Sequence, residues 1–400
     1  TQHKLKHNNY LGTNTFTTFH RQNQKSIKMS EPSTPRLVNP DGTYPCKPLE
    51  KEVISLAVIQ SNCCQVMGIP PSKLNKDEIL TKNIDKMLSL AEDACQDSTP
   101  DIMLFHEFPI TGFLAGPGWD RATKLEWAIE IPGPYTSKLC ALAKEKDMYV
   151  IFGSYAKDPV DWPGHVLSIQ TVIGRDGVIQ KQIWKPKNIM RYYPGSELTT
   201  TTVSSVRTKF REMYGVENEF PVLQTEFGNI AVCTVQLDPF VYAAYAMKGT
   251  ELMLRTSTLF YREDVISTAL TYNMYSAMAN IPYGRMPFAE YGGHSMVCSP
   301  KGKVMDEVTS CSDEGFIKVD IPIGEYRKER KQPQCAMALT KDIFDQYVEE
   351  VPIDHLLEAD VENRAEGDAC QDCLDGKKLP NDGKEMKALI DQKSRWISEE

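Results

Sequence analysis

The sequence predicts a mixed fold in which β-sheets are covered by helices, either a layered α/β fold or an α+β fold. Strand-sized apolar runs alternate with stretches of helical spacing, hairpin patterns interrupt that alternation, and no internal repeat is visible. With 400 residues, of which 41% are hydrophobic and 25% charged, the chain is long enough for a sizeable core. We expect that core in residues 51–335.

The first half of this region predicts three buried strands separated by helices. The run ISLAVIQ at 54–60 is apolar and rich in β-branched residues, and a helix is expected from about Asp77 to Cys95 because its apolar residues recur at helical spacing. Further strands are expected at 101–107 and, after a helix at 136–147, at 148–156. The segment 166–184 predicts a hairpin, because two alternating strands flank Arg175-Asp176-Gly177.

The second half continues with two more strand and helix units. The strand at 228–236 precedes a helix at 239–249, and the strand at 251–258 precedes a long helix from Glu263 to about Asn280. The segments 294–305 and 314–321 then predict an antiparallel pair.

Both ends of the chain differ in composition from this region. Residues 1–50 are rich in Asn, Thr, Gln and Pro, which predicts disorder, and the first 28 lack the apolar stretch of a secretory signal. They could be a flexible tail, an upstream stretch before Met29 or a transit peptide. Residues 336–400 are acidic and predict an extension that is partly helical.

Charge and cysteine content limit the partners and the compartment. The formal charge of −9, from 45 basic and 54 acidic residues, would repel a phosphate backbone or an anionic lipid surface, so neither nucleic acid nor membrane is expected as a partner. Eleven cysteines without a dense framework indicate a reducing compartment, and we expect a cytoplasmic protein. The single CxxC at 370–373 lacks the further ligands of a zinc site, so no metal is expected.

Three reactive side chains lie at or near the carboxyl ends of predicted strands, where open sheets place ligands. They are the carboxylate of Glu107, the ammonium of Lys185 and the thiol of Cys233. Together they would supply a base, a group that stabilises an oxyanion and a nucleophile. The alternative from spacing alone is that the charges lie in solvated loops and that Cys233 is a small hydrophobic core residue.

Several segments in register resemble the nitrilase (carbon-nitrogen hydrolase) superfamily, and most of all its aliphatic amidase and formamidase branch. The similarity runs from about residue 54 to 325 and rests on MLFHEFPITGF, in which His106 replaces a usual proline, DGVIQKQIWK, YYPGSEL, AMKGTELMLR and GGHSMVCSPKGKV. The resemblance implies a four-layer αββα sandwich that forms homo-oligomers, with the C-terminal extension reaching a neighbouring subunit. It also implies hydrolysis of a small aliphatic amide to acid and ammonia through a cysteine thioester, without a cofactor.

By that resemblance Glu107 is the base, Lys185 stabilises the oxyanion, and Arg255 could orient Glu107 or the substrate. No carboxylate occupies the place of the family's second glutamate, where Met190 or Arg191 stands instead.

The nucleophile position is ambiguous. Counting back from the following helix reaches Cys233, whereas counting forward along the strand reaches Val235. Two hypotheses therefore stay open: an amidase that uses Cys233, and an inactive member with Val235 in the nucleophile place and a binding or assembly role.

Overall fold

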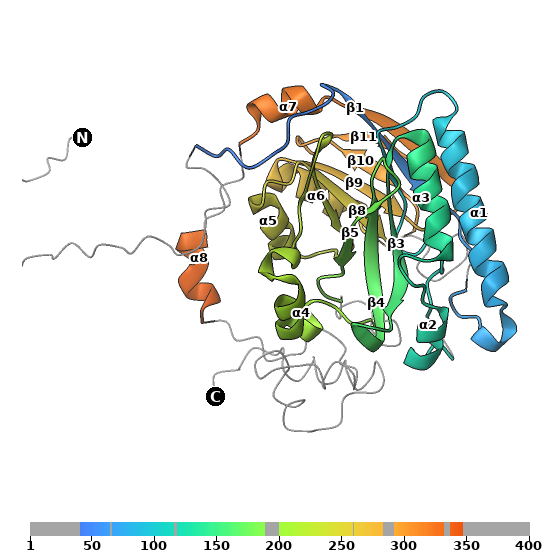
Figure 1. The fold of residues 1–400 in the computed structure, drawn as a ribbon. Coiled ribbons are helices and arrows are strands. Elements are labelled where there is room, and N and C mark those ends of the chain that lie inside the picture. The colour runs from blue at the N-terminus through green and yellow to red at the C-terminus, as the bar shows by residue number, and fades with distance from the viewer. Residues whose placement is uncertain are drawn as a thin grey trace, which may run out of the picture. The chain divides into compact units, whose positions relative to one another are not determined.

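The computed structural model describes residues 41–346 except 65, 116–117, 189–199, 259, 283–291 and 332–336. Two six-stranded mixed sheets pack face to face in this part of the chain (Figure 1). The first sheet has the order β12 (Gly315–Ile321), β1 (Ile54–Gln60), β2 (Ile102–Leu104), β3 (Tyr149–Asp158), β4 (Trp162–Ile173) and β5 (Ile179–Trp184). The second has the order β11 (Val304–Glu307), β10 (Met296–Cys298), β9 (Tyr275–Asn280), β8 (Leu252–Ser257), β7 (Gly228–Cys233) and β6 (Leu223–Thr225).

The two sheets share one plan. In each, three adjacent strands are parallel, β1 to β3 in the first sheet and β7 to β9 in the second, and the outer strands are antiparallel to their neighbours. The carboxyl ends of parallel strands meet at one edge of a sheet, which is where such sheets place their ligands.

Helices cover the outer faces of the sheets (Figure 1). The helices α1 (Lys76–Cys95) and α3 (Pro134–Lys146) pack on the first sheet, and α5 (Pro239–Met247) and α6 (Arg262–Tyr272) pack on the second. Shorter helices are α2 (Arg121–Trp127), α4 (Arg207–Tyr214), α7 (Ile323–Glu329) and α8 (Met337–Phe344), with 3₁₀ turns at Pro71–Lys73, Ser204–Val206 and Val216–Asn218. The layers are therefore helix, sheet, sheet and helix, as the family resemblance implies.

Alternation along each strand assigns its side chains to one of two cores. On β7, Ile230 and Val232 lie in the layer between the sheets, whereas Ala231 and Cys233 lie in the layer under the helices. Successive side chains of a strand point to opposite faces, so the layer that a residue joins follows from its parity.

The predicted long helix from 263 to about 280 is wrong in its second half. The helix α6 ends at Tyr272, where Asn273 adopts a left-handed conformation with φ 48°, and β9 follows. Because β9 is buried on both faces, its side chains lack the period-2 contrast that marks a half-exposed strand.

The predicted pairing of 294–305 with 314–321 is also wrong. The first segment forms its own hairpin, β10 with β11, and β12 joins the other sheet antiparallel to β1.

In residues 41–50, whose composition predicts disorder, Tyr44 and Leu49 pack against the rest of the protein while most of the other side chains are exposed. Tyr44 is buried and donates a hydrogen bond to Glu251 over 2.8 Å. Residues 1–40, and 347–400 of the predicted C-terminal extension, lie outside the described residues.

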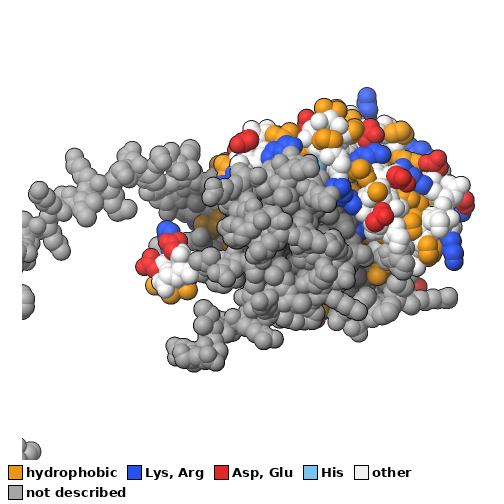
Figure 2. Space-filling model, turned by 90° about the horizontal axis from the view of Figure 1, so that it is seen from below, with side chains coloured by type: hydrophobic (Ala, Val, Ile, Leu, Met, Phe, Trp, Pro, Cys, Tyr) orange, Lys and Arg blue, Asp and Glu red, His pale blue; other side chains and the backbone are white. Residues whose placement is uncertain are grey.

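On the described part of the face shown in Figure 2, positive, negative and hydrophobic side chains are interspersed. None of the described helices has the length and apolarity needed to span a bilayer.

Candidate active site

Three side chains meet where strands of the two sheets end. Glu107 follows β2, Lys185 follows β5 and Thr234 follows β7. The Nζ of Lys185 and the Oγ1 of Thr234 each lie 3.0 Å from the same atom, Oε1 of Glu107. Glu107 is only 4% exposed, so its carboxylate forms a buried ion pair with Lys185. The hydroxyl of Thr234 donates a further hydrogen bond to the same carboxylate.

The surroundings hold the Glu107 carboxylate in place from both sheets. Ser168 of β4 donates a third hydrogen bond to Oε1 over 3.3 Å, and the backbone N–H of Glu107 donates to the carbonyl of Ser257 at the end of β8 over 3.4 Å. Gly153 of β3 is required here because a Cβ at that position would overlap the backbone carbonyl of Glu107. The carboxylate is thus fixed between the two sheets.

His106 lies beside Glu107 in sequence but belongs to the packing of the fold. Its Nε2 lies 3.1 Å from the carbonyl oxygen of Ser61, and its Nδ1 accepts the N–H of Phe108 over 3.3 Å. Complete burial lowers the pKa of His106 to about 3, so the ring is neutral near pH 7. A neutral ring with both nitrogens engaged cannot serve as a proton donor to the site.

Cys233 does not face this site. Its side chain is 1% exposed and packs with Val235, Tyr242 and Tyr245 in the apolar layer between the second sheet and its helices. Burial raises the pKa of the Cys233 thiol to about 11. A thiol of that kind is a poor nucleophile near neutral pH because almost none of it is thiolate.

Val235 joins the same layer as Cys233, so both positions reached by counting lie on the helix-facing side. Cys233, which the sequence predicts to act with Glu107 and Lys185, does not contact them; the residue between the two counts, Thr234, contacts Glu107 instead. The alternation of β7 could have indicated this, because Thr234 has the parity of Ile230 and Val232.

Arg255 is also placed differently from the prediction. It shares the helix-facing side of β8 with Met253 and is fully buried, with Nη1 2.7 Å from Asp264 of α6 and its guanidinium 4.2 Å from the ring centre of Tyr242. Arg255 therefore joins β8 to the helices α5 and α6, and it does not contact Glu107.

The Arg255 and Asp264 pair supports the turn that follows Thr234. Asp264 accepts the N–H of Leu237 over 3.1 Å, and Leu237 adopts φ 55°, which a branched residue rarely does without support. At the next residue, Asp238 caps α5 and pairs with Lys187. Lys187, two residues after Lys185, thus contacts the residue that caps α5.

The segment 189–199, where the family's second glutamate would be sought and where Met190, Arg191 and Glu197 stand, lies outside the described residues. Within the described ranges, no group of three or more His, Cys, Asp or Glu side chains has a geometry for a metal ion.

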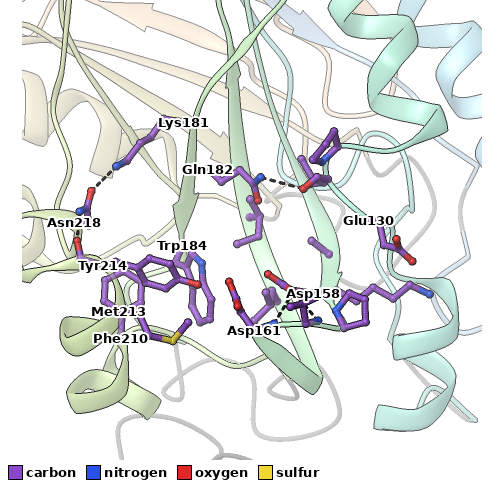
Figure 3. Close-up of a pocket in the computed structure, with 18 residues that line it drawn as sticks. Glu130, Asp158, Asp161, Lys181, Gln182, Trp184, Phe210, Met213, Tyr214 and Asn218 are labelled. Atoms are coloured by element: carbon purple, nitrogen blue, oxygen red, sulfur yellow. Dashed lines mark hydrogen bonds between the residues drawn. The ribbon is translucent and has the colours of Figure 1, made fainter.

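A cavity of about 680 Å³ lies elsewhere, on the outer face of the first sheet beside α4 (Figure 3). Trp184, Phe210 and Tyr214 form one wall, and Asp158 and Asp161 lie to their right in Figure 3. Trp184 alternates with Ile183, which faces the other sheet, so the cavity and the Glu107 site lie on opposite faces.

Comparison with known proteins identifies the family of this chain. The family model described as carbon-nitrogen hydrolase matches residues 56–331, which is more than half of the chain. The chain belongs to the carbon-nitrogen hydrolase family. Among curated relatives, the omega-amidase NIT2 of Xenopus tropicalis is 25% identical over 228 residues, which are 55% of this chain and 78% of that protein.

Solved structures of carbon-nitrogen hydrolases share the fold. A double mutant of the amidase from Nesterenkonia sp. AN1, in complex with acrylamide, superposes with a TM-score of 0.51 at 16% identity, covering 74% of this chain and 98% of that one. The NitFhit protein of C. elegans superposes with a TM-score of 0.52 at 18% identity, covering 74% of this chain and 65% of that one. At these identities the likeness concerns the fold.

Proposed function

We propose that this chain hydrolyses the carbon–nitrogen bond of a small, uncharged carboxamide, releasing ammonia, and that it does so at Glu107 and Lys185 without a thioester on Cys233. The observation that carries the proposal is the shared oxygen: Lys185 and Thr234 both contact Oε1 of Glu107 at 3.0 Å in a buried position. This arrangement combines a base, a cation and a hydroxyl.

Charge supports an uncharged substrate. Glu107 neutralises Lys185, and in the adjacent turn Asp238 neutralises Lys187. These two described pairs carry no net charge, so they give no Coulombic gain to a buried carboxylate or ammonium ligand, whose desolvation would cost about 3 kcal/mol or more. An amide carbonyl instead needs a donor for its oxygen, which Lys185 supplies.

Known relatives support the reaction class. The curated relative is an omega-amidase, and the amidase from Nesterenkonia sp. AN1 was captured with acrylamide, a small amide. We extend that class to this chain. The aliphatic substrates expected from the sequence (formamide, acetamide and propionamide) are the first to test.

Each step has a group to perform it. Glu107 takes the proton of the attacking group, Lys185 donates a hydrogen bond to the oxygen that gains negative charge, and the proton returns to the leaving nitrogen as ammonia departs. Because Cys233 lies in the helix-facing layer, the nucleophile is a hydroxyl or water on the Glu107 side.

The test is ammonia release from these amides by the wild type, Glu107→Gln and Lys185→Met. Loss of a general base typically lowers the rate by about 10² to 10⁴, and loss of an oxyanion donor by about 10² to 10³. Lys181→Met is the matched control, because Lys181 lies on β5, the strand that Lys185 follows, but binds Asn218 and not Glu107. Equal turnover in wild type and Glu107→Gln would contradict the proposal.

A second candidate follows from the placement of Cys233 and Val235 in the helix-facing layer. A member without a working nucleophile would bind an amide and release no ammonia. Calorimetric binding of acetamide that Lys185→Met abolishes, with no turnover on any amide, would favour this binding role.

A further inference from the structure

We propose that Thr234 is the nucleophile of the site and that it forms an oxygen ester with the acyl group of the substrate. This inference rests on the proposed function and names the atom that attacks. The candidate nucleophiles are the hydroxyls of Thr234 and Ser168 and the thiol of Cys233. Of these, Thr234 both contacts the base Glu107 and lies just after the end of its strand, β7.

The contact with the base is direct. Thr234 Oγ1 donates to Oε1 of Glu107 over 3.0 Å, which is the geometry a general base needs to take a hydroxyl proton. A threonine side chain has few allowed χ1 rotamers, so this orientation is largely fixed before a substrate binds.

The backbone around Thr234 distinguishes it from Ser168. Ser168 lies within β4, paired with β3, and its hydroxyl also accepts from Gln170 over 3.4 Å. Thr234 follows the last residue of β7 and precedes the turn in which Leu237 is held at φ 55° by Asp264. Both side chains are buried, with 4% of Thr234 and 2% of Ser168 exposed, but Thr234 lies at the carboxyl edge of the sheet, whereas Ser168 is enclosed between paired strands.

The opposite placement of Cys233 removes the thiol alternative. Its sulfur lies in the apolar layer with Tyr242 and Tyr245, and its weak hydrogen bond goes to the carbonyl of Val235 over 3.9 Å. Turning it toward Glu107 would reverse the parity of β7 and remove Ile230 and Val232 from the core between the sheets.

The chemistry balances with water as the only co-reactant. The Oγ1 of Thr234 forms a bond to the amide carbon while its proton passes to Glu107, and the carbonyl electrons move to the oxygen, which Lys185 stabilises. The tetrahedral adduct then breaks its C–N bond, and the proton on Glu107 leaves with the nitrogen as ammonia. Water, deprotonated by Glu107, hydrolyses the ester and restores the Thr234 hydroxyl.

The test is acid-quenched acylation by p-nitrophenyl acetate, with the acetyl group located by peptide mass spectrometry. An activated ester transfers its acyl group without needing ammonia to leave, so the assay reports the nucleophile even if amides are not turned over. We compare the wild type with Thr234→Val, which keeps the shape and loses the hydroxyl, Thr234→Ser, which keeps the hydroxyl, and Cys233→Ala.

We expect an acetyl group on Thr234 that resists neutral hydroxylamine, as an oxygen ester does. Thr234→Ser and Cys233→Ala should retain it, and Thr234→Val and Glu107→Gln should lose it. Acylation of Cys233, or turnover of amides that persists in Thr234→Val, would overturn the inference. Acylation of Thr234 without ammonia release from any amide would leave the nucleophile standing and refute the proposed amide hydrolysis.

Discussion

We predict that burial of His106 lowers the stability of the protein at acidic pH and that the substitution His106→Gln removes this effect. The buried ring has a pKa of about 3 in the folded protein, against 6.5 for an ordinary histidine. Below pH 6.5 His106 binds a proton in the unfolded chain but stays neutral in the folded protein. The free energy of unfolding therefore falls as the pH drops from 6.5 toward 3. Above about pH 6.5 the buried His106 causes no such loss.

The magnitude follows from the two pKa values. Integrating the linkage relation between about pH 7 and about pH 5 gives a loss of about 2 kcal/mol from this one group. Carboxylates with depressed pKa values, such as Glu219 and Glu307, add their own losses at lower pH. Their contribution is common to the wild type and a His106 variant, so the difference between the two proteins isolates the histidine.

The assay is urea unfolding followed by tryptophan fluorescence at these two pH values, for the wild type and His106→Gln. The variant has a lower stability at neutral pH because it changes the contacts with Ser61 and Phe108, but it should lose about 2 kcal/mol less on acidification. An identical loss in both proteins would refute the claim that His106 is buried and neutral.

Two further predictions concern the support of the site. Asp264→Asn removes the charged partner of the buried Arg255 guanidinium. Loss of one member of such a pair typically lowers the free energy of unfolding in urea by about 3 to 5 kcal/mol. A change below about 1 kcal/mol would show that the pair is not essential. Gly153→Ala should displace the backbone of Glu107 and lower both the melting temperature and ammonia release. Gly315→Ala is the control and should keep normal ammonia release, because a Cβ there would meet only Val308 at an ordinary contact distance of 3.7 Å. Normal amide turnover in Gly153→Ala would contradict the tight packing against Glu107.

Much of the fold could be predicted from local patterns. The strand at 54–60, the helix beginning near Asp77 and the hairpin of β4 and β5 follow from apolar periodicity and from the turn at Gly177, which adopts φ 78°. The second half of 263–280 could not, because β9 is buried on both faces and its composition is compatible with a helix. Pairing of β12 with β1 joins residues more than 250 positions apart, which no local pattern specifies.

The candidate site was predictable in its charged residues and not in its orientation. Strand ends indicated Glu107 and Lys185, and the structure brings them to 3.0 Å. Counting along the family motif at β7 reaches only Cys233 and Val235, which share a parity, whereas the parity of the core places Thr234 on the Glu107 side. A position at a strand end favours Arg255 as a site residue, but alternation on β8 directs it under the helices.

The most direct test of the account is the reactivity of Cys233 toward iodoacetamide in the folded protein at about pH 8, measured peptide by peptide. Cys46, which is exposed, provides an internal control in the same digest. We predict that Cys46 is alkylated in the native protein and that Cys233 is alkylated only in urea, because its thiol is buried and has a pKa of about 11. Rapid alkylation of native Cys233, with loss of ammonia release in the same proportion, would contradict the central claim that the site is formed by Glu107, Lys185 and Thr234.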